Sequence, residues 1–362
     1  MKYWRGYLVA AVAMAGAWGL KAFASTHSTL VDMVYPYVSR MIQTFLASWS
    51  AGAGFNVWQV AIAVLVAALL ASVVLMIVLK WNLVRWLGWV LAVAGLIGLM
   101  NTAIFGLNMY ASPLAEDIHL KNTEYQYNLE EMEAAAIFYR DKAIALSEEL
   151  PEQTPSFETL AEQAGEGFYI LTYQKHMPVF SGSTEPVKKL DNARFLKSFG
   201  ITSITVPMTG ESAVNADIPM QTLPFVMCHE MAHRMTIAAN HDADFAAFLA
   251  CQANPSAQFG YSGYFMAFLH CYNALKAVEH LEPEMVENFE LGITEKLKKD
   301  MEGYYAFFGE EAQTDGQTTD LLVIWYVQEY VLPEYEEEEN PFDPKDEDAV
   351  DLSGIVNAKP KE

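Results

Sequence analysis

The sequence PFVMCHEMAHRMTIAANHDADFAAFLAC, from Pro224 to Cys251, is the most informative part of the chain. It contains the pattern H-E-x-x-H, formed by His229, Glu230 and His233. On a helix, positions i and i+4 lie on one face, so the two imidazoles can bind a single ion. Glu230 lies one position further round, where it can reach a metal-bound water without binding the metal. The pattern therefore predicts one zinc ion, with Glu230 as the general base of a hydrolytic reaction.

A third protein ligand is expected for a catalytic zinc ion. The chain is expected to turn shortly after the motif, and DADFAAFLAC is expected to start a second helix that runs back past the first. On that helix Asp242 shares a face with the apolar Phe245 and Leu249. We therefore predict Asp242 as the third metal ligand; the alternative role for an Asp at this position is to cap the helix. The alternative ligands are His241 and Asp244 nearby, and His270 and Glu290 further along the chain.

Other side chains are weaker candidates for the same site. Tyr261, Tyr264 and Tyr326 could donate a hydrogen bond to a developing oxyanion, but each could also simply pack in the core or on the surface. Asn215 and Asp217 precede the motif and could orient a ligand histidine, or they could form a turn.

Charge is distributed unevenly along the 362 residues. The first 109 residues contain one acidic residue, Asp32, and six basic ones, whereas the net charge of the whole chain is −23. Such an acidic chain is not expected to bind nucleic acid, because phosphate binding requires Lys and Arg. The three cysteines, Cys228, Cys251 and Cys271, are expected to be buried free thiols, with a Cys251–Cys271 disulfide as the alternative.

Three apolar segments have the length of a membrane span, at about residues 7–23, 58–79 and 86–107. We interpret the first as an anchor that is retained. Its alternative is a cleaved signal peptide, because Ala22-Phe23-Ala24 resembles a cleavage site.

Basic residues near the ends of the spans predict their orientation. Lys2 and Arg5 place the N-terminus in the cytoplasm, and Lys80 and Arg85 place the second turn on the same side. The segment 28–50 then lies outside, where its helical apolar spacing predicts a helix on the membrane surface or against the soluble domain. Everything after the third span is expected to be extracytoplasmic, on a multi-pass protein of the bacterial plasma membrane.

The rest of the chain predicts a mainly α soluble domain over residues 110–332, of a zincin-like α+β fold with a small β element. The tail, residues 333–362, is acidic and is expected to be disordered. Residues 200–208 predict a strand that Pro207 keeps from the centre of a sheet, and residues 209–219 predict turns. The predicted helices cover residues 127–150, 160–173, a segment from about 219–224 through the motif, 242–254, 263–280, 282–308 and 319–331.

Six segments carry a resemblance to a known family: VYPYVSRM, LNMYASPLAED, VPMTGESAVNADIPMQTLPFVMCHEMAHRM, DADFAAFLAC, YSGYFMAFLHCYNAL and TTDLLVIWYVQEY. From about residue 30 to residue 331 the chain resembles an uncharacterised bacterial family of three-span membrane proteins. That family is a domain of unknown function, and its C-terminal H-E-x-x-H domain is similar to gluzincin-type zinc metallopeptidases. The resemblance implies ligands at His229 and His233, a catalytic Glu230 and a carboxylate ligand at Asp242. The chain departs from the family in having Asp242 in place of the usual Glu, and Thr236 in place of the usual Gly.

Two functions follow from these observations. The first is a membrane-anchored zinc metallopeptidase that hydrolyses extracytoplasmic peptides or proteins, held to membrane lipid by its three spans. None of the spans has an ionisable residue at its centre, which argues against cleavage within the membrane. The second is a catalytically inactive metal-binding protein that acts as a sensor or an assembly partner.

Overall fold

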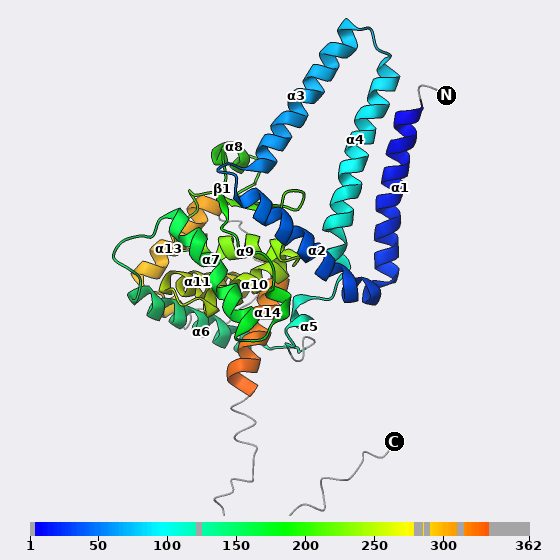
Figure 1. Cartoon of the computed structure of the whole chain (residues 1–362). Helices are drawn as coiled ribbons and strands as arrows, with labels where there is room; N and C mark the ends of the chain where they lie inside the picture. The colour runs from blue at the N-terminus through cyan, green and yellow to red at the C-terminus, as the bar shows by residue number, and fades with distance from the viewer. Residues whose placement is uncertain (1–3, 121–124, 279–284, 286–289, 310–314, 333–362) are drawn as a thin grey trace, which may run out of the picture.

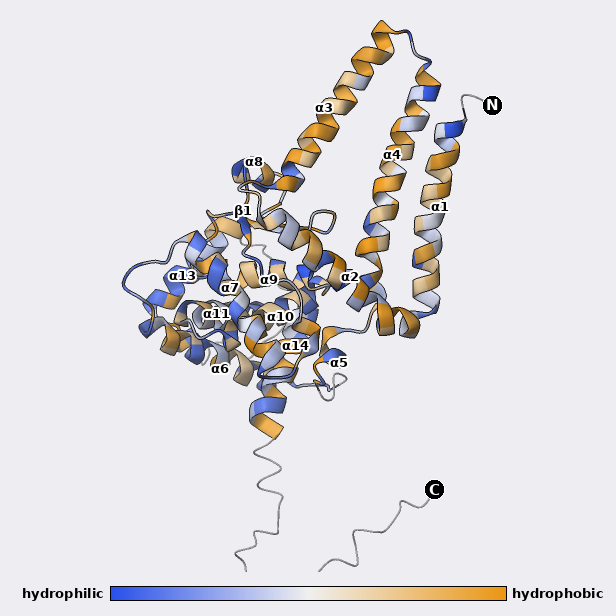
Figure 2. Ribbon diagram, viewed as in Figure 1, coloured by the Kyte–Doolittle hydropathy of each residue, from blue (hydrophilic) through white to orange (hydrophobic). Residues whose placement is uncertain are grey.

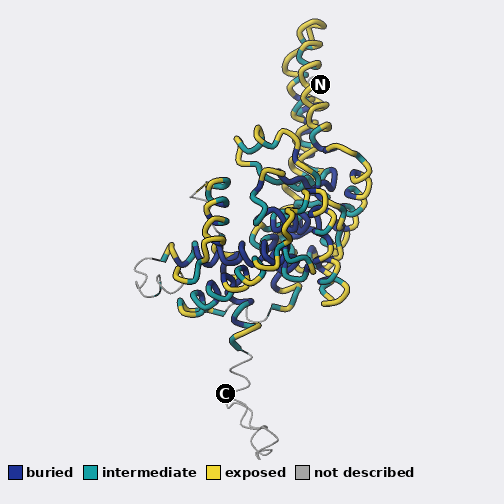
Figure 3. The backbone as a smooth tube through the Cα atoms, turned by 90° about the vertical axis from the view of Figure 1, so that its left-hand side faces the viewer, coloured by how far each residue is buried: buried dark blue, intermediate teal, exposed yellow. Residues whose placement is uncertain are grey.

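Three long apolar helices project from a helical body (Figure 1). The computed structural model describes residues 4–120, 125–278, 285, 290–309 and 315–332. Buried residues gather in the body, whereas most residues of the three projecting helices are exposed (Figure 3). The predicted acidic tail and part of the predicted helix 282–308 lie outside the described residues.

The projecting helices are α1 (Arg5–Thr26), α3 (Val57–Val78) and α4 (Leu83–Ile104). Each is long and apolar enough to cross a membrane, and together they match the three predicted spans (Figure 2). Helices α1 and α4 pack together, and a Cβ atom added at Gly6 would lie only 2.4 Å from the carbonyl carbon of Gly88. Small residues therefore allow the close approach of these two helices. Helix α3 diverges from them and meets α4 near the connecting turn, where Trp86 Nε1 donates to Ser72 Oγ at 3.0 Å.

Helix α2 (Ser28–Ala51) lies between α1 and α3 and packs against the body. The turn between two strands of the body packs closely against α2. Gly210 in that turn has a φ of 66°, and an added Cβ would lie 2.5 Å from the backbone nitrogen of Ala47. A glycine is needed here both for the left-handed backbone and for the close approach of α2.

The main hydrophobic core of the body is built mainly from helices. A smaller cluster lies at the sheet, around Leu190 and Ala213. The predicted helix 127–150 is confirmed as α6, which begins with a capping box between Asn128 and Glu131. The motif helix α9 and helices α10 and α11 also agree with the predicted segments, apart from a few residues at their ends. The helices of the body are α5 (Leu114–Asp117), α6 (Leu129–Glu148), α7 (Phe157–Tyr173), α8 (Ala193–Lys197), α9 (Leu223–Arg234), α10 (Asn240–Ala253), α11 (Ala257–Lys276), α13 (Glu295–Phe308) and α14 (Gly316–Tyr326), with the shorter turns η1 (Gly106–Tyr110), η2 (Pro178–Phe180) and η3 (Val327–Val331).

A three-stranded sheet lies beside α9, in the order β1–β3–β2. Strand β3 (Glu211–Val214) is central, parallel to β1 (Lys188–Lys189) and antiparallel to β2 (Ser203–Val206). The predicted strand 200–208 is thus confirmed as β2, at the edge of the sheet and directly before Pro207. The prediction of turns over residues 209–219 holds for residues 209–210 but is wrong for residues 211–214, which form β3. The polar side chains of Glu211 and Ser212 are buried there, because they bind partners in α3, β1 and α9.

Candidate metal and catalytic site

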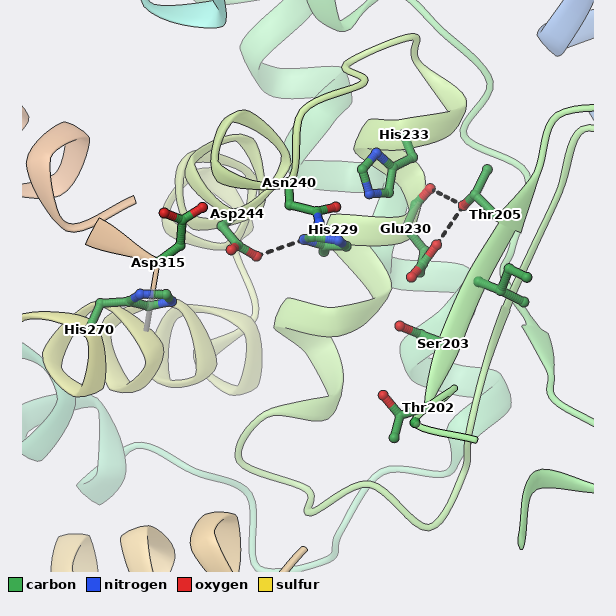
Figure 4. A pocket seen from close by; sticks show the side chains of 12 residues that line it. Thr202, Ser203, Thr205, His229, Glu230, His233, Asn240, Asp244, His270 and Asp315 are labelled. Atoms are coloured by element: carbon green, nitrogen blue, oxygen red, sulfur yellow. Dashed lines mark hydrogen bonds and ion pairs between the residues drawn. The ribbon is translucent and has the colours of Figure 1, made fainter. Parts of the chain in front are cut away.

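The H-E-x-x-H helix borders a cavity of about 560 Å³. His229, Glu230 and His233 on α9 line it, as the i, i+4 spacing predicts (Figure 4). Strand β2 forms the opposite wall through Ser203, Ile204 and Thr205. Further side chains of the lining come from the start of α10, from α11 and from the start of α14: Asn240, Asp244, His270 and Asp315.

Both histidines have an oxygen acceptor at Nδ1. His229 Nδ1 lies 2.7 Å from Asp244 Oδ1, and His233 Nδ1 lies 2.8 Å from the carbonyl oxygen of Ile237. A carbonyl oxygen and an ionised carboxylate can only accept, so the proton of each neutral ring is on Nδ1. Each Nε2 then carries a free lone pair, as a metal ligand requires. The two rings are edge to face, with their centroids 4.6 Å apart.

The electrostatics distinguish the two rings. Burial would lower the pKa of His229, but the charge and hydrogen bond of Asp244 outweigh burial and hold that pKa above its ordinary value. Burial and the neighbouring His229 lower the pKa of His233. For Asp244, burial is outweighed by the charge of His229 and its hydrogen bond, and the pKa is lowered. The carboxylate of Asp244 thus makes the neighbourhood of His229 favourable for a cation.

Glu230 is oriented by the sheet. Thr205 Oγ1 on β2 lies 2.6 Å from Glu230 Oε2 and 2.8 Å from the backbone oxygen of the same residue. On β3, Ser212 Oγ donates to that backbone oxygen at 3.0 Å. The edge strand therefore fixes the carboxylate at the cavity wall beside the two histidines (Figure 4).

The residue beside His229 is Asp244, not Asp242. Asp242 is buried, as predicted, with 7% of its surface exposed, but it lines a different cavity of about 240 Å³ together with Arg40 and Asp117. Its Oδ1 has no hydrogen-bond partner among the described residues, and burial raises its pKa. The structure therefore does not bring Asp242 to the histidines.

The motif brings two imidazoles together at the cavity, but a third potential metal ligand is not assembled beside them among the described residues. Among the described residues, no three His, Cys, Asp or Glu side chains are close enough together to hold a metal ion. Asp244 already bonds to His229 and occupies the position of a partner that orients a ligand. His270 lines the far end of the cavity, and burial lowers its pKa (Figure 4). Its Nδ1 has no hydrogen-bond partner in the part of the chain that the structure describes.

The other predicted candidates lie away from this cavity. His241 lines the smaller cavity, and Glu290 accepts a hydrogen bond from Tyr272. Asn215 accepts from the backbone nitrogen of Asp217, so this pair forms a turn. The three predicted oxyanion donors, Tyr261, Tyr264 and Tyr326, are absent from the cavity lining.

Sequence reasoning missed Thr205 and Asp315 at the cavity. Thr205 could have been suspected only from its place on a strand near the motif, because nothing in its spacing relates it to Glu230. Asp315 is the N-cap of α14, and its Oδ1 accepts from the backbone nitrogen of Gln317. The three cysteines are buried free thiols, and Cys251 lies against Cys228, at 3.8 Å, rather than against Cys271.

The turn after the motif contains a strained residue. Thr236 has a φ of 77°, in the left-handed region that a β-branched side chain rarely adopts. Its buried hydroxyl donates to the carbonyl oxygen of Met235. A glycine would adopt this backbone without the strain of a side chain.

Comparison with known families assigns the chain to a group. A family model described as "Protein of unknown function (DUF3810)" matches residues 31–326, which is most of the chain, so the protein belongs to that family. No curated protein and no solved structure matches it.

Proposed function

We propose that the protein is a membrane-anchored, zinc-dependent hydrolase that cleaves extracytoplasmic peptides or proteins. The observation that carries the proposal is the pair of Nδ1 hydrogen bonds on His229 and His233. They leave both Nε2 atoms available for one ion, on the helix face where Glu230 also reaches the cavity. The two half-buried histidines, held in this state beside a carboxylate, would supply two of the three protein ligands of a catalytic metal site.

Each residue has a distinct role in this proposal. His229 and His233 hold one zinc ion through Nε2, and Asp244 orients His229. When bound, the ion lowers the pKa of a coordinated water to around 7. Glu230 would accept a proton from the attacking water as the water oxygen bonds to the peptide carbonyl carbon. It would then deliver that proton to the amine nitrogen as the C–N bond breaks. The hydroxyl of Thr205 keeps Glu230 Oε2 in place between these two transfers.

The edge strand supports a peptide as the substrate. Strand β2 pairs with β3 on one side, and the described residues contain no strand on its other side. Three of its residues line the cavity, namely Ser203, Ile204 and Thr205. A free strand edge offers backbone donors and acceptors to an extended peptide, which would then pass in front of Glu230.

The location follows from the arrangement of the apolar helices. The N-terminus and the turn between α3 and α4 lie at one end of these helices, and the body lies at the other (Figure 1). The basic residues Arg5, Lys80 and Arg85 are all at the end away from the body. By the positive-inside rule, that end is cytoplasmic, and the body faces the exterior of a bacterial plasma membrane.

A second candidate is a metal-binding protein without catalytic activity, acting as a sensor or an assembly partner. One observation favours it: no third ligand is assembled near His229 and His233 among the described residues. Two imidazoles would then hold a bound ion, and groups other than the described side chains would fill its remaining coordination positions.

Peptide cleavage tests the proposal. The full chain is purified in detergent, loaded with zinc and incubated with a mixture of unstructured peptides, whose fragments are identified by mass spectrometry. Glu230→Gln should lower the cleavage rate by about 10²-fold or more while keeping zinc bound, since general acid–base catalysis contributes at least this much. Glu162→Gln, an exposed residue on α7, is the matched control and should cleave like the wild type.

Two results would decide against the hydrolase. Cleavage by Glu230→Gln at the wild-type rate would show that the activity does not come from this site. Zinc-loaded wild-type protein that cleaves no peptide in the mixture would favour the second candidate.

A further inference from the structure

Helix α2 lies on the surface of the body with its apolar face outward. A helix on a water-exposed surface normally has its polar face outward. Within α2, which is described in full, no exposed residue between Leu30 and Trp49 is charged. The exposed fractions of Met41 and Phe45 reach 74% and 71%. Large apolar side chains recur at helical spacing along this outer face: Leu30, Met33, Val34, Tyr37, Val38, Met41, Phe45 and Trp49.

Four polar residues of α2 are buried on its opposite face: Ser39, Arg40, Gln43 and Ser50. Ser39 Oγ donates to the carbonyl oxygen of Ile104 at 2.7 Å. Gln43 Nε2 donates to the carbonyl oxygen of Pro207 at 3.1 Å. Turning α2 to bury its apolar face would leave these buried groups without partners, at a cost in free energy for each. The rotation of α2 is therefore fixed with its apolar face outward.

Arg40 connects the same inner face to the H-E-x-x-H helix. Its Nε donates at 3.1 Å to the carbonyl oxygen of Met235, the C-cap residue of α9, and its Nη1 donates at 3.1 Å to the carbonyl oxygen of Pro178. The side chain of Arg40 is buried, and burial lowers its pKa. A shift of α2 would therefore be transmitted to the end of the motif helix.

The ends of α2 fix its level relative to the apolar helices. It begins two residues after the end of α1 and is joined to the start of α3 by the short segment 52–56. Figure 1 shows it crossing the space between the base of α4 and the base of α3, at the body end of both. If these helices cross a bilayer, α2 lies at the bilayer surface on the side of the body.

We propose that α2 is seated in the bilayer, with its eight outward apolar side chains in contact with lipid and its polar face bound to the body. Lipid is the occupant because the face continues the exposed apolar surfaces of α3 and α4. The aromatic rings of Tyr37 and Trp49 suit the boundary between headgroups and acyl chains. Because Arg40 binds the C-terminal end of α9, the position of α2 in the bilayer also fixes the distance between α9 and the membrane.

Spin-label accessibility in the full chain tests this proposal. Met41→Cys and Phe45→Cys are labelled with a nitroxide, and the protein is reconstituted into phosphatidylcholine–phosphatidylglycerol bilayers. The three native cysteines are buried, so unsubstituted protein should take up no label. Ala145→Cys, at an exposed position of α6 on the side of the body away from the apolar helices, is the matched control (Figure 1).

Oxygen concentrates in the hydrocarbon region, whereas a nickel chelate stays in water. We expect the ratio of oxygen to nickel-chelate collision rates at Met41 and Phe45 to exceed the ratio at Ala145 several-fold. A ratio equal to that at Ala145 would place the face in water and overturn the proposal. Exclusion of both reagents from Met41 and Phe45 would show that protein, such as a second copy of the chain, covers the face, and would also overturn it.

Discussion

Glu211 on β3 joins the body to the start of α3, and its removal should destabilise the protein strongly. Its carboxylate is fully buried, with a side-chain exposure of 0%. Oε1 accepts from Val57 N at 2.9 Å and from Lys188 Nζ at 2.7 Å, and Oε2 accepts from Trp58 N at 2.8 Å. The carboxylate thus caps the N-terminus of α3, where a negative charge is favourable.

The size of the effect follows from what Glu211→Ala leaves behind. The ammonium group of Lys188, which is only 17% exposed, loses its carboxylate partner, and removing one partner of a buried pair costs about 3–5 kcal/mol. Two backbone N–H groups of α3 also lose their acceptor, although water can reach into the space left by the side chain. For a folded part of this size, such a loss lowers the melting temperature by on the order of 10 °C.

A double-mutant cycle with Lys188→Met measures the pair directly. Full-length variants are melted in the same detergent and followed by circular dichroism. We expect the double variant to be less destabilised than the sum of the single variants by about 1–3 kcal/mol, because neither charge is then left alone. Glu158→Ala is the control, since Glu158 pairs with Lys189 on the surface, where the two side chains are 63% and 50% exposed, and its melting temperature should not change measurably. If Glu211→Ala melts like Glu158→Ala, or the cycle is additive, the coupling through Glu211 is refuted.

Two further predictions concern the motif and its turn. Asp244→Ala should weaken zinc binding by about 10–100-fold in a chelator competition, because the substitution removes the hydrogen-bond acceptor of His229 Nδ1. Asp242→Ala should leave the zinc affinity unchanged, because Asp242 lines a different cavity. If Asp242→Ala weakens zinc binding and Asp244→Ala does not, Asp242 is the ligand. Thr236→Gly should be more stable than Thr236→Ala by about 1 kcal/mol in thermal or chemical unfolding, because alanine retains the strain of a left-handed backbone. The ordinary order, with alanine more stable, would show that the turn is unstrained.

Local sequence patterns predicted the features that depend only on residues close together in the sequence. The three apolar helices follow from composition alone, and the shared face of His229 and His233 follows from the geometry of one helix. The apolar pattern of α10 did not identify Asp244 as the residue beside His229. Residues Phe245 through Cys251 are all buried, so the apolar residues of α10 do not mark a single buried face.

Strand β3 was missed for a related reason. Its sequence begins with Glu211 and Ser212, which favour a turn when read locally. In the folded protein the carboxylate binds the start of α3, and the hydroxyl binds the backbone oxygen of Glu230. Both partners are distant in sequence, so only the tertiary structure shows why polar residues occupy a central strand.

The zinc content of the purified full-length chain tests the proposed metal site. Wild type, His229→Ala and His233→Ala are dialysed against zinc, freed of excess metal, and their zinc is measured by elemental mass spectrometry. We expect one zinc ion per wild-type chain and a loss of that ion in both variants, because both imidazoles would bind it. Wild-type protein without bound zinc, or either variant retaining the wild-type amount, would show that His229 and His233 do not form a zinc site.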